Sequence, residues 1–145
     1  MAKRVIFAGP ANEHPELVEG TSAVALTPGY AVTRSGGTFA LLNAVATNAT
    51  EVIIVNRRGS GYEGDITTQW PIGDTVYAVR PRSGQFVNVA CKTAQTLTKG
   101  DILTTKASAG GLFEKGVAGT DVPLLYVGEV ITTTAAGQLV RAYKA

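Results

Sequence analysis

The residues that could support catalysis in this 145-residue chain are few and far apart in the sequence. Cys91 is the single cysteine and His14 the single histidine, and together they would supply a thiol nucleophile and its base. Nothing beside either residue suggests an orienting third group or an oxyanion site. His14 lies in a polar, turn-like segment and Cys91 in an alternating apolar stretch, so we expect a surface histidine and a small buried thiol.

Acidic residues form one regular cluster, Glu13, Glu16 and Glu19, which are spaced three apart. On a helix this spacing gives a solvated acidic face. A calcium-type site would also need a turn glycine and a second set of oxygen ligands, which the cluster lacks. Because there is one cysteine, neither a disulfide within the chain nor a cysteine-based zinc site is expected. We therefore predict no metal and no cofactor.

Two basic segments that contain glycine remain as candidates for ligand binding. Residues 57–64 (RRGSGYEG) follow a predicted strand, but no helix and no Gly-Lys-Ser/Thr follow, so a surface loop ordered by a partner is favoured over a phosphate site. Residues 81–84 (PRSG) resemble the Pro-Arg-Ser-Gly motif of trimeric dUTP pyrophosphatases, in which the arginine and serine contact phosphates. That family's aspartate motifs and glycine-rich C-terminal arm are missing here. A nucleotide-binding β-domain that uses Arg82 and Ser83 is kept as an alternative.

The composition indicates a protein that is covered by partners. Charged residues make up 17% of the chain, against about 25% in average soluble domains, and 45% of residues are hydrophobic. A monomer of this mass exposes roughly 7,000 Å², and a standard contact covers about 800 Å² per partner, so two or three contacts would account for the missing charge. The net charge of +2 comes without a basic stripe, and no apolar run reaches the ~20 residues of a membrane helix. We predict neither nucleic acid nor membrane as a partner.

Alternation of apolar and polar residues predicts short strands along most of the chain. We expect strands within residues 51–55, 75–80, 86–91, 122–131 and 138–143, with a first strand or arm at residues 4–7. Residues 51–55 are a β-branched run, which is typical of a strand covered on both faces. One helical turn is expected at residues 14–20, and a hairpin-like connection at residues 132–137.

A phrase of turn, strand, Ser/Gly turn and phenylalanine occurs three times, at residues 29–39, 73–86 and 100–113. Its uneven spacing argues against a solenoid. The copies are either equivalent hairpins of one barrel or an accidental similarity. We predict one all-β domain over residues 1–145, a small barrel or a β-clip-like or jelly-roll domain of short antiparallel strands. Residues 1–20 would form an extended N-terminal arm and a short turn, and residues 21–145 the β core.

Four segments in the C-terminal third of the chain carry a family resemblance. Residues 97–104 (LTKGDILT), 110–113 (GGLF), 127–131 (VGEVI) and 136–142 (AGQLVRA) are similar to small capsid decoration (cement) proteins of tailed bacteriophages, with an echo at residues 26–39. The resemblance implies a structural virion protein, assembled in the host cytoplasm, that binds the outside of a phage head and stabilises the shell without catalysis. It implies the major capsid protein and copies of itself as partners, with a homotrimer favoured over a dimer. Another β-rich virion or tail component is the alternative.

The resemblance directs attention to an apolar, β-prone arm and to the glycine-rich loop as contact regions. An arm of this kind can add a strand to a neighbouring sheet. The candidate contacts are Arg4, Ile6 and Phe7 in the arm, Arg57, Arg58 and Tyr62 in the loop, and the lone tryptophan, Trp70. Trp70 is included because tryptophan often anchors interfaces. The competing interpretation is that Trp70 packs in the chain's own core.

Overall fold

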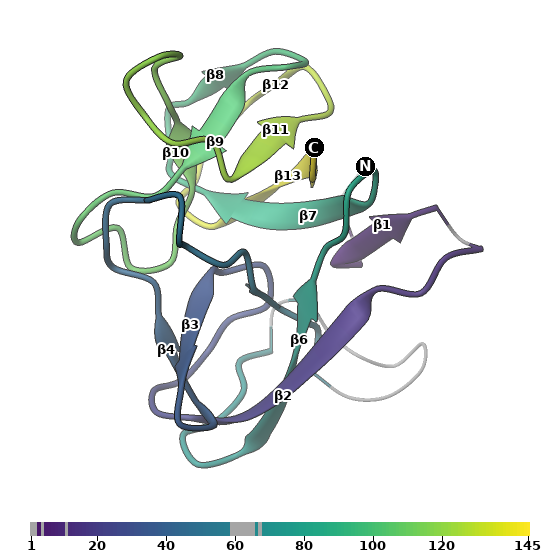
Figure 1. Cartoon of the computed structure of the whole chain (residues 1–145), viewed down its shortest axis with the longest axis vertical. Coiled ribbons are helices and arrows are strands. Elements are labelled where there is room, and N and C mark those ends of the chain that lie inside the picture. Colours follow the sequence, from purple (N-terminus) through teal and green to yellow (C-terminus); the bar gives the residue numbers. More distant parts are fainter. Residues whose placement is uncertain (1–2, 4, 11, 59–65, 67) are drawn as a thin grey trace.

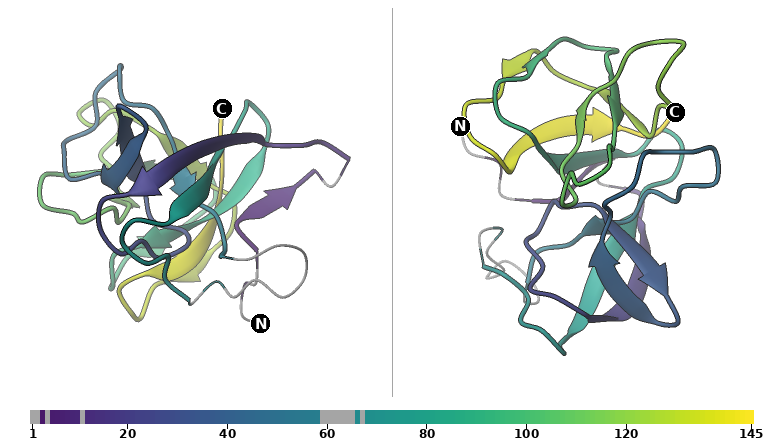
Figure 2. Two further views of the ribbon diagram at one scale, coloured as in Figure 1. Left: turned by 90° about the horizontal axis from the view of Figure 1, so that it is seen from below. Right: turned by 90° about the vertical axis from the view of Figure 1, so that its left-hand side faces the viewer.

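The computed structural model describes residues 3, 5–10, 12–58, 66 and 68–145, which form two stacked lobes of β-sheet (Figure 1). Thirteen strands and no helix occur in these residues, which confirms the all-β prediction. It follows that the described part of the chain holds no helix able to cross a membrane. Figure 2 shows the same two lobes from two further directions.

The first lobe, at the bottom of Figure 1, is a five-stranded sheet. The strand order is β3 (Val32–Ser35), β4 (Thr38–Leu41), β2 (Glu16–Ser22), β6 (Thr75–Arg80) and β5 (Ile54–Val55). Its neighbours pair antiparallel, except for β2 and β4, which run parallel. An isolated bridge between Ala31 and Ile54 brings the residue before β3 against β5. The sheet therefore curls until its ends meet at one point, without closing into a regular barrel.

The second lobe contains a six-stranded antiparallel sheet and a small two-stranded one. The larger sheet has the order β1 (Phe7–Gly9), β7 (Phe86–Cys91), β13 (Gln138–Tyr143), β11 (Leu125–Val127), β9 (Ile102–Thr104) and β10 (Glu114–Lys115); the smaller one pairs β8 (Thr96–Leu97) with β12 (Ile131–Thr132). A parallel bridge joins Cys91 to Phe113, the residue before β10, and the Phe113 amide donates to the Ala90 carbonyl at 2.9 Å. This sheet also curls back on itself and stays open.

The cores of the lobes meet across the first sheet. Val52 and Ile54 pack into a cluster that continues through β7, β13, β11 and β9, which we call the shared core. Ile53 and Val55 point the other way, into a cluster with Phe39 that we call the first-lobe core. The prediction of a strand covered on both faces at residues 51–55 is confirmed for Ile54–Val55, which form β5, whereas residues 51–53 precede the strand and Glu51 is exposed. Because each fully buried aliphatic side chain contributes about 1.5–3 kcal/mol, this run helps hold the lobes together.

The three copies of the repeated phrase share their local shape and differ in their pairing. The first copy forms the β3–β4 pair and the third forms β9–β10. The second copy supplies β6 to the first lobe and β7 to the second, so its two strands are not paired with each other. The phrase is therefore a way of starting and ending strands and does not define one repeated hairpin.

Two glycines from this phrase bring the lobes together. A Cβ on Gly29 (φ +93°) would lie 2.5 Å from Leu139 Cδ2 in the second lobe. A Cβ on Gly111 (φ +82°) would lie 2.7 Å from the Ala31 carbonyl oxygen in the first lobe. Backbone bonds accompany both contacts, from the Ala90 amide to the Gly29 carbonyl and from the Ala31 amide to the Gly111 carbonyl, each at 2.8 Å. Close approach combined with positive φ makes glycine necessary at both positions.

Two local predictions are wrong. The expected helical turn at residues 14–20 is instead the start of β2, which pairs with β6 over six residues. Val18, Gly20 and Ser22 are buried and Leu17 is exposed. Burial thus repeats every two residues, as in a strand, although the proline and glycine positions resemble the ends of a helix. The connection at residues 132–137 is not a hairpin either, because β12 pairs with β8 whereas β13 pairs with β7 and β11.

Candidate interaction surface

The N-terminal arm is docked on the chain's own second lobe. β1 lies at the edge of the six-stranded sheet beside β7, and Ile6 is 1% exposed in the shared core. The Asn88 amide donates to the Ile6 carbonyl and the Asn88 side-chain Nδ2 donates to the Val5 carbonyl, both at 2.7 Å. Lys3 Nζ lies 2.8 Å from Glu129 Oε1. The arm is thus a strand of its own sheet in the single chain.

This placement separates the three arm residues that were predicted as contacts. Arg4 lies outside the described residues. The side chain of Ile6 is buried, so it could reach a partner only if the arm left its own sheet. Phe7 is half-buried against the shared core and keeps an exposed part. The contact role of these residues remains a prediction.

The glycine-rich loop is described only at its beginning. Arg57 is half-buried, and its backbone amide donates to Asn56 Oδ1 at 2.9 Å. Arg58 Nη2 lies 3.8 Å from Asp74 Oδ2, with both side chains more than 40% exposed. Such an exposed pair adds little to stability, so Arg58 is free to exchange its partner. Tyr62 lies outside the described residues.

Trp70 packs inside the chain. It is 7% exposed in the first-lobe core, and its indole Nε1 donates to the Asn56 carbonyl at 2.9 Å. Its backbone exchanges two hydrogen bonds with Leu26, at 2.8 and 3.0 Å. In the single chain this geometry supports the competing interpretation of a core aromatic.

Exposed apolar side chains form a surface feature that the sequence reasoning missed. Leu17 on β2 is 56% exposed and Tyr77 on β6 is 45% exposed. They share one face of the sheet, since Leu17 stands opposite Val79 and Glu19 opposite Tyr77. Residues 16–22 (ELVEGTS) alternate in burial but not in residue type, so no sequence pattern signalled this face. Ile72 and Val130 are at least 70% exposed outside the strands.

A hollow of about 430 Å³ opens between the lobes. Tyr30 and the turn before it line one side, and Leu139 with the segment before β13 lines the other. Among the described lining residues, Lys3 alone has a charged side chain, and its ammonium group is paired with Glu129. The described part of its lining therefore brings together no acid and base of the kind that proton transfer requires.

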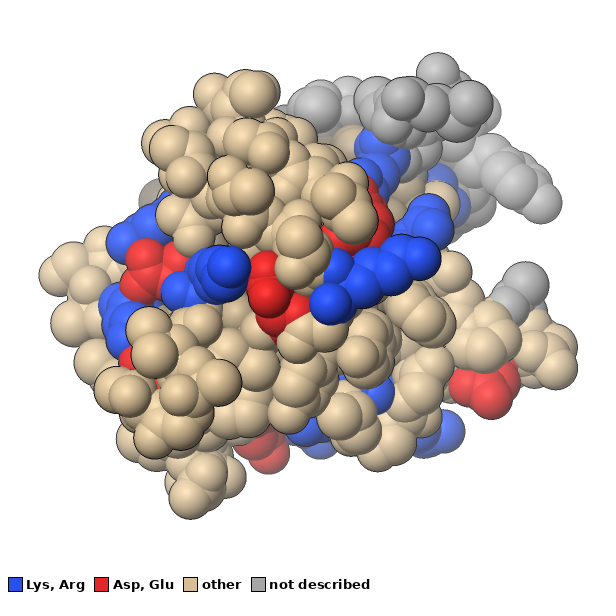
Figure 3. Space-filling view, turned by 90° about the horizontal axis from the view of Figure 1, so that it is seen from above, with Lys and Arg blue, Asp and Glu red and all other residues tan. Residues whose placement is uncertain are grey.

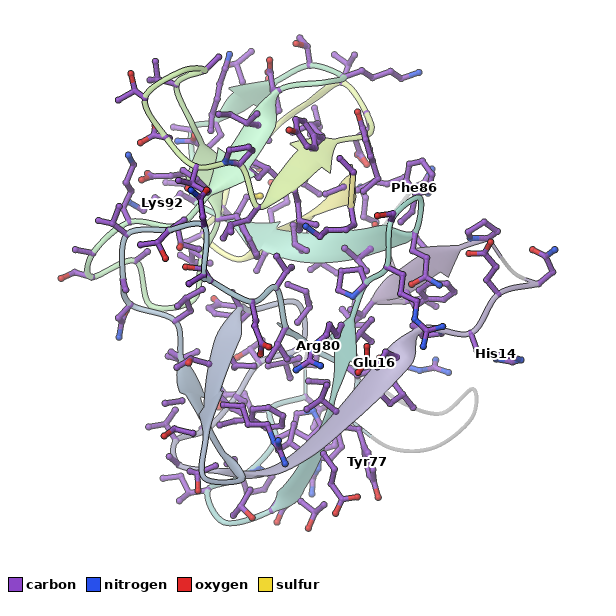
Figure 4. The ribbon with its side chains drawn as sticks, in the orientation of Figure 1. His14, Glu16, Tyr77, Arg80, Phe86 and Lys92 are labelled. Atoms are coloured by element: carbon purple, nitrogen blue, oxygen red, sulfur yellow. The ribbon has the colours of Figure 1, made fainter. Side chains whose placement is uncertain are left out.

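The candidate thiol–imidazole pair is not formed. Cys91 is fully buried in β7, whereas His14 is exposed and points away from the body of the protein (Figure 4). Burial, together with the negative charge of Glu129, raises the pKa of the Cys91 thiol to about 12. The nucleophilic form of cysteine is the thiolate, so this thiol is inert at neutral pH. The predictions of a buried thiol and a surface histidine are confirmed.

The remaining polar candidates are held in structural contacts. Arg80 lies 3.0 Å from Glu16 and 3.1 Å from Glu51, and Figure 4 shows Arg80 beside Glu16 where the lobes meet. In the Pro-Arg-Ser-Gly segment, Ser83 Oγ donates to the Ala145 carbonyl at 3.0 Å and the Gly84 amide to the Lys144 carbonyl at 2.8 Å. Across the described residues no group of three His, Cys, Asp or Glu side chains could hold a metal ion.

Charged side chains on the second lobe occur largely as neighbours of opposite sign. Lys92 lies 3.0 Å from Glu114 and Lys115 lies 3.4 Å from Asp101, while Lys106 pairs with Asp121. The Lys106 ammonium group, followed by the Val117 amide, lowers the pKa of the Asp121 carboxyl. Seen from above, acidic and basic groups adjoin along a band with uncharged surface on both sides (Figure 3). Among its described residues, this face therefore presents no single-sign patch for electrostatic capture of a ligand.

Comparison with known proteins shows a likeness in fold. No family model matches the chain, and no curated protein matches it. Among solved structures, the fold is similar to the N base of the head fibre gp8.5 of bacteriophage phi29, with a TM-score of 0.54 and 12% sequence identity. The similarity covers 91% of this chain and 95% of that one. Both lobes are therefore included in the shared fold.

Proposed function

We propose that the chain is a structural, non-catalytic component of a bacteriophage virion that binds the outside of the head. The observation that carries this proposal is the fold shared with a phage head-fibre base over 91% of the chain. The resemblance of residues 97–142 to phage cement proteins points to the same location by a separate route.

The partners in this proposal are the major capsid protein and further copies of the chain, with a homotrimer favoured over a dimer. The low content of charge and the exposed Leu17 and Tyr77 on one sheet face support a surface that is covered after assembly. Many identical sites on a head would make weak single contacts sufficient, because multivalent attachment multiplies their effect.

Two finer roles are compatible with this location. A cement protein would stabilise the shell directly, as the resemblance of the sequence suggests. A fibre base would hold a projecting structure on the head, and this role is favoured by the name of the phi29 protein. The two differ in what heads lose without the protein: resistance to heat or low salt in the first case, and a projection in the second.

The test is reconstitution on heads made without the protein. Phage heads from a strain in which this gene is deleted would be mixed with the purified chain and sedimented. The proposal predicts saturable co-sedimentation with a fixed number of copies per head, and no co-sedimentation with isolated tails. Binding to tails alone, or binding that never saturates, would contradict it.

A further inference from the structure

The edge of β1 differs from the other edges of the two large sheets in the described structure. β3 and β5 are drawn together by the Ala31–Ile54 bridge, and β10 follows the residue that bridges to Cys91. β1 has β7 on one side and no strand on the other, and it lies at the margin of the molecule in Figures 1 and 2. An uncovered edge is a template for pairing with another strand.

The backbone of Phe7 faces this open side. Phe7 stands opposite Val87, and the Asn88 amide donates to the Ile6 carbonyl. In an antiparallel ladder these two facts make Phe7 and Val87 a non-hydrogen-bonded pair. The N–H and C=O of Phe7 therefore point away from β7, where an added strand would find one donor and one acceptor.

A groove of about 390 Å³ follows the same edge. Its lining is formed by the arm on one side and by the segment before β2 on the other: Val5, Phe7, Ala8, Gly9, Glu13, His14 and Pro15. The buried amide of Gln85 holds the second wall, with Nε2 at 3.4 Å from the His14 carbonyl and 3.5 Å from Glu13 Oε2. The groove is thus formed before any partner arrives.

The lining residues also favour an occupant with a positive charge. Val5 is 42% exposed and gives the groove an apolar wall, while the carboxylate of Glu13 is exposed at its mouth. No lysine or arginine is among the described lining residues. An occupant with an apolar side chain flanked by a basic one complements this surface.

We propose that the groove accepts an extended segment of a partner protein, which is added to β1 as a further strand and places a lysine or arginine against Glu13. The pairing uses the Phe7 backbone, as in other cases of strand addition to a sheet edge. The groove is a feature of the isolated chain. If strand addition at β1 were disproved, the proposed attachment to a phage head would be unaffected, and disproof of that attachment would leave the groove proposal unaffected.

The experiment uses the full chain and two short capped peptides, a basic one (TKVTVKT) and its acidic counterpart (TEVTVET). Amide hydrogen exchange would be followed by NMR, with peptide up to roughly 1 mM so that weak complexes are populated. The basic peptide should slow exchange at the Phe7 amide. The Asn88 amide is the internal control, since it already donates to the Ile6 carbonyl at 2.7 Å and should be protected without peptide.

The variant Glu13→Lys supplies the matched charge control. It should reverse the preference, so that the acidic peptide binds more tightly than the basic one by up to about five-fold, the scale of one exposed ion pair. Unchanged exchange at Phe7 with either peptide would overturn the proposal, and so would protection confined to another strand. If protection of the Phe7 amide increased with protein concentration in the absence of peptide, the occupant of the groove would be a second copy of the chain, and the proposed partner segment would be wrong.

Discussion

The first lobe brings its curled sheet together through Ala31 and Ile54, and the second lobe does so through Phe113 and Cys91. In both lobes the bridging residue comes two positions after a glycine at positive φ, Gly29 in the first and Gly111 in the second. The connections differ, because one bridge is antiparallel and the other parallel. Gly29 opens its copy of the repeated phrase and Gly111 lies near the end of another, so the comparison teaches that a glycine turn followed by a bridging residue can serve at different positions of the phrase.

The lobes also differ in how their sheets are covered. The strand at Ile54–Val55 is buried on both faces and contributes to both cores. In the second lobe, β7 carries the docked arm, which contains β1, and Asn88 of β7 contacts Val5 and Ile6. Since residues of the first sheet belong to the shared core, we expect the lobes to unfold as one cooperative unit.

The largest effect is expected from breaking the joint between the lobes. Gly111→Ala places a Cβ 2.7 Å from the Ala31 carbonyl oxygen, and should lower the free energy of unfolding by about 3–5 kcal/mol, the range of severe single substitutions. Gly119→Ala is the matched control, because Gly119 has the same φ of +82° and nothing within 4 Å of the added Cβ. It should lose about 1–2 kcal/mol from backbone strain alone. Urea unfolding measures both, and equal losses would show that the joint is not tight.

The second lobe can be probed through the pH dependence of stability at Cys91. Its thiol has a pKa of about 12 in the folded chain, above the ordinary value of 9.0. As the pH rises past 9, the unfolded chain releases the thiol proton first, so stability falls as the pH approaches 12. Cys91→Ala lacks this loss. Urea unfolding at pH 8, 10 and 11 should show a smaller alkaline decline in the variant, and equal declines would contradict the buried thiol.

The first lobe can be probed at Trp70. Trp70→Phe removes the indole N–H that donates to the Asn56 carbonyl and leaves that oxygen unpaired. We expect a loss of about 1–3 kcal/mol. Chemical denaturation followed by circular dichroism measures it. A neutral result would mean that the indole makes no net contribution to the first-lobe core.

The smallest effect is expected on the surface where the lobes meet. Glu51→Gln removes one of the two carboxylates beside Arg80, and the Glu51 side chain is 63% exposed. A change within about 0.5 kcal/mol is expected, because Glu16 still pairs with Arg80 and exposed pairs contribute little. A loss above about 1 kcal/mol would show that this ion pair helps to hold the lobes together.

Several parts of the fold were predictable because they rest on local patterns. Period-two alternation indicated the β class, and the run at residues 51–55 indicated a strand covered on both faces. The burial of Cys91 followed from its apolar neighbours. The β2 strand was missed because Pro15 and Gly20 resemble the ends of a helix and because residues 17–22 alternate in burial but not in residue type.

The rest depends on contacts between distant segments, which local patterns do not report. The burial of Ile6 depends on a β7 whose Asn88 holds the arm, and the burial of Trp70 depends on Leu26 and Asn56. The same residue types on a surface would be interface anchors. The groove beside β1 arises where residues 5–9 and 13–15 meet around Gln85, and no single segment of the sequence signals it.

Cryo-electron microscopy of heads reconstituted with the purified chain tests the central claim most directly. The account predicts repeated density on the outer surface of the head into which the two-lobed domain fits with both lobes occupied. Density confined to the tail or to the interior of the head, or an outer surface identical to that of heads without the protein, would contradict it.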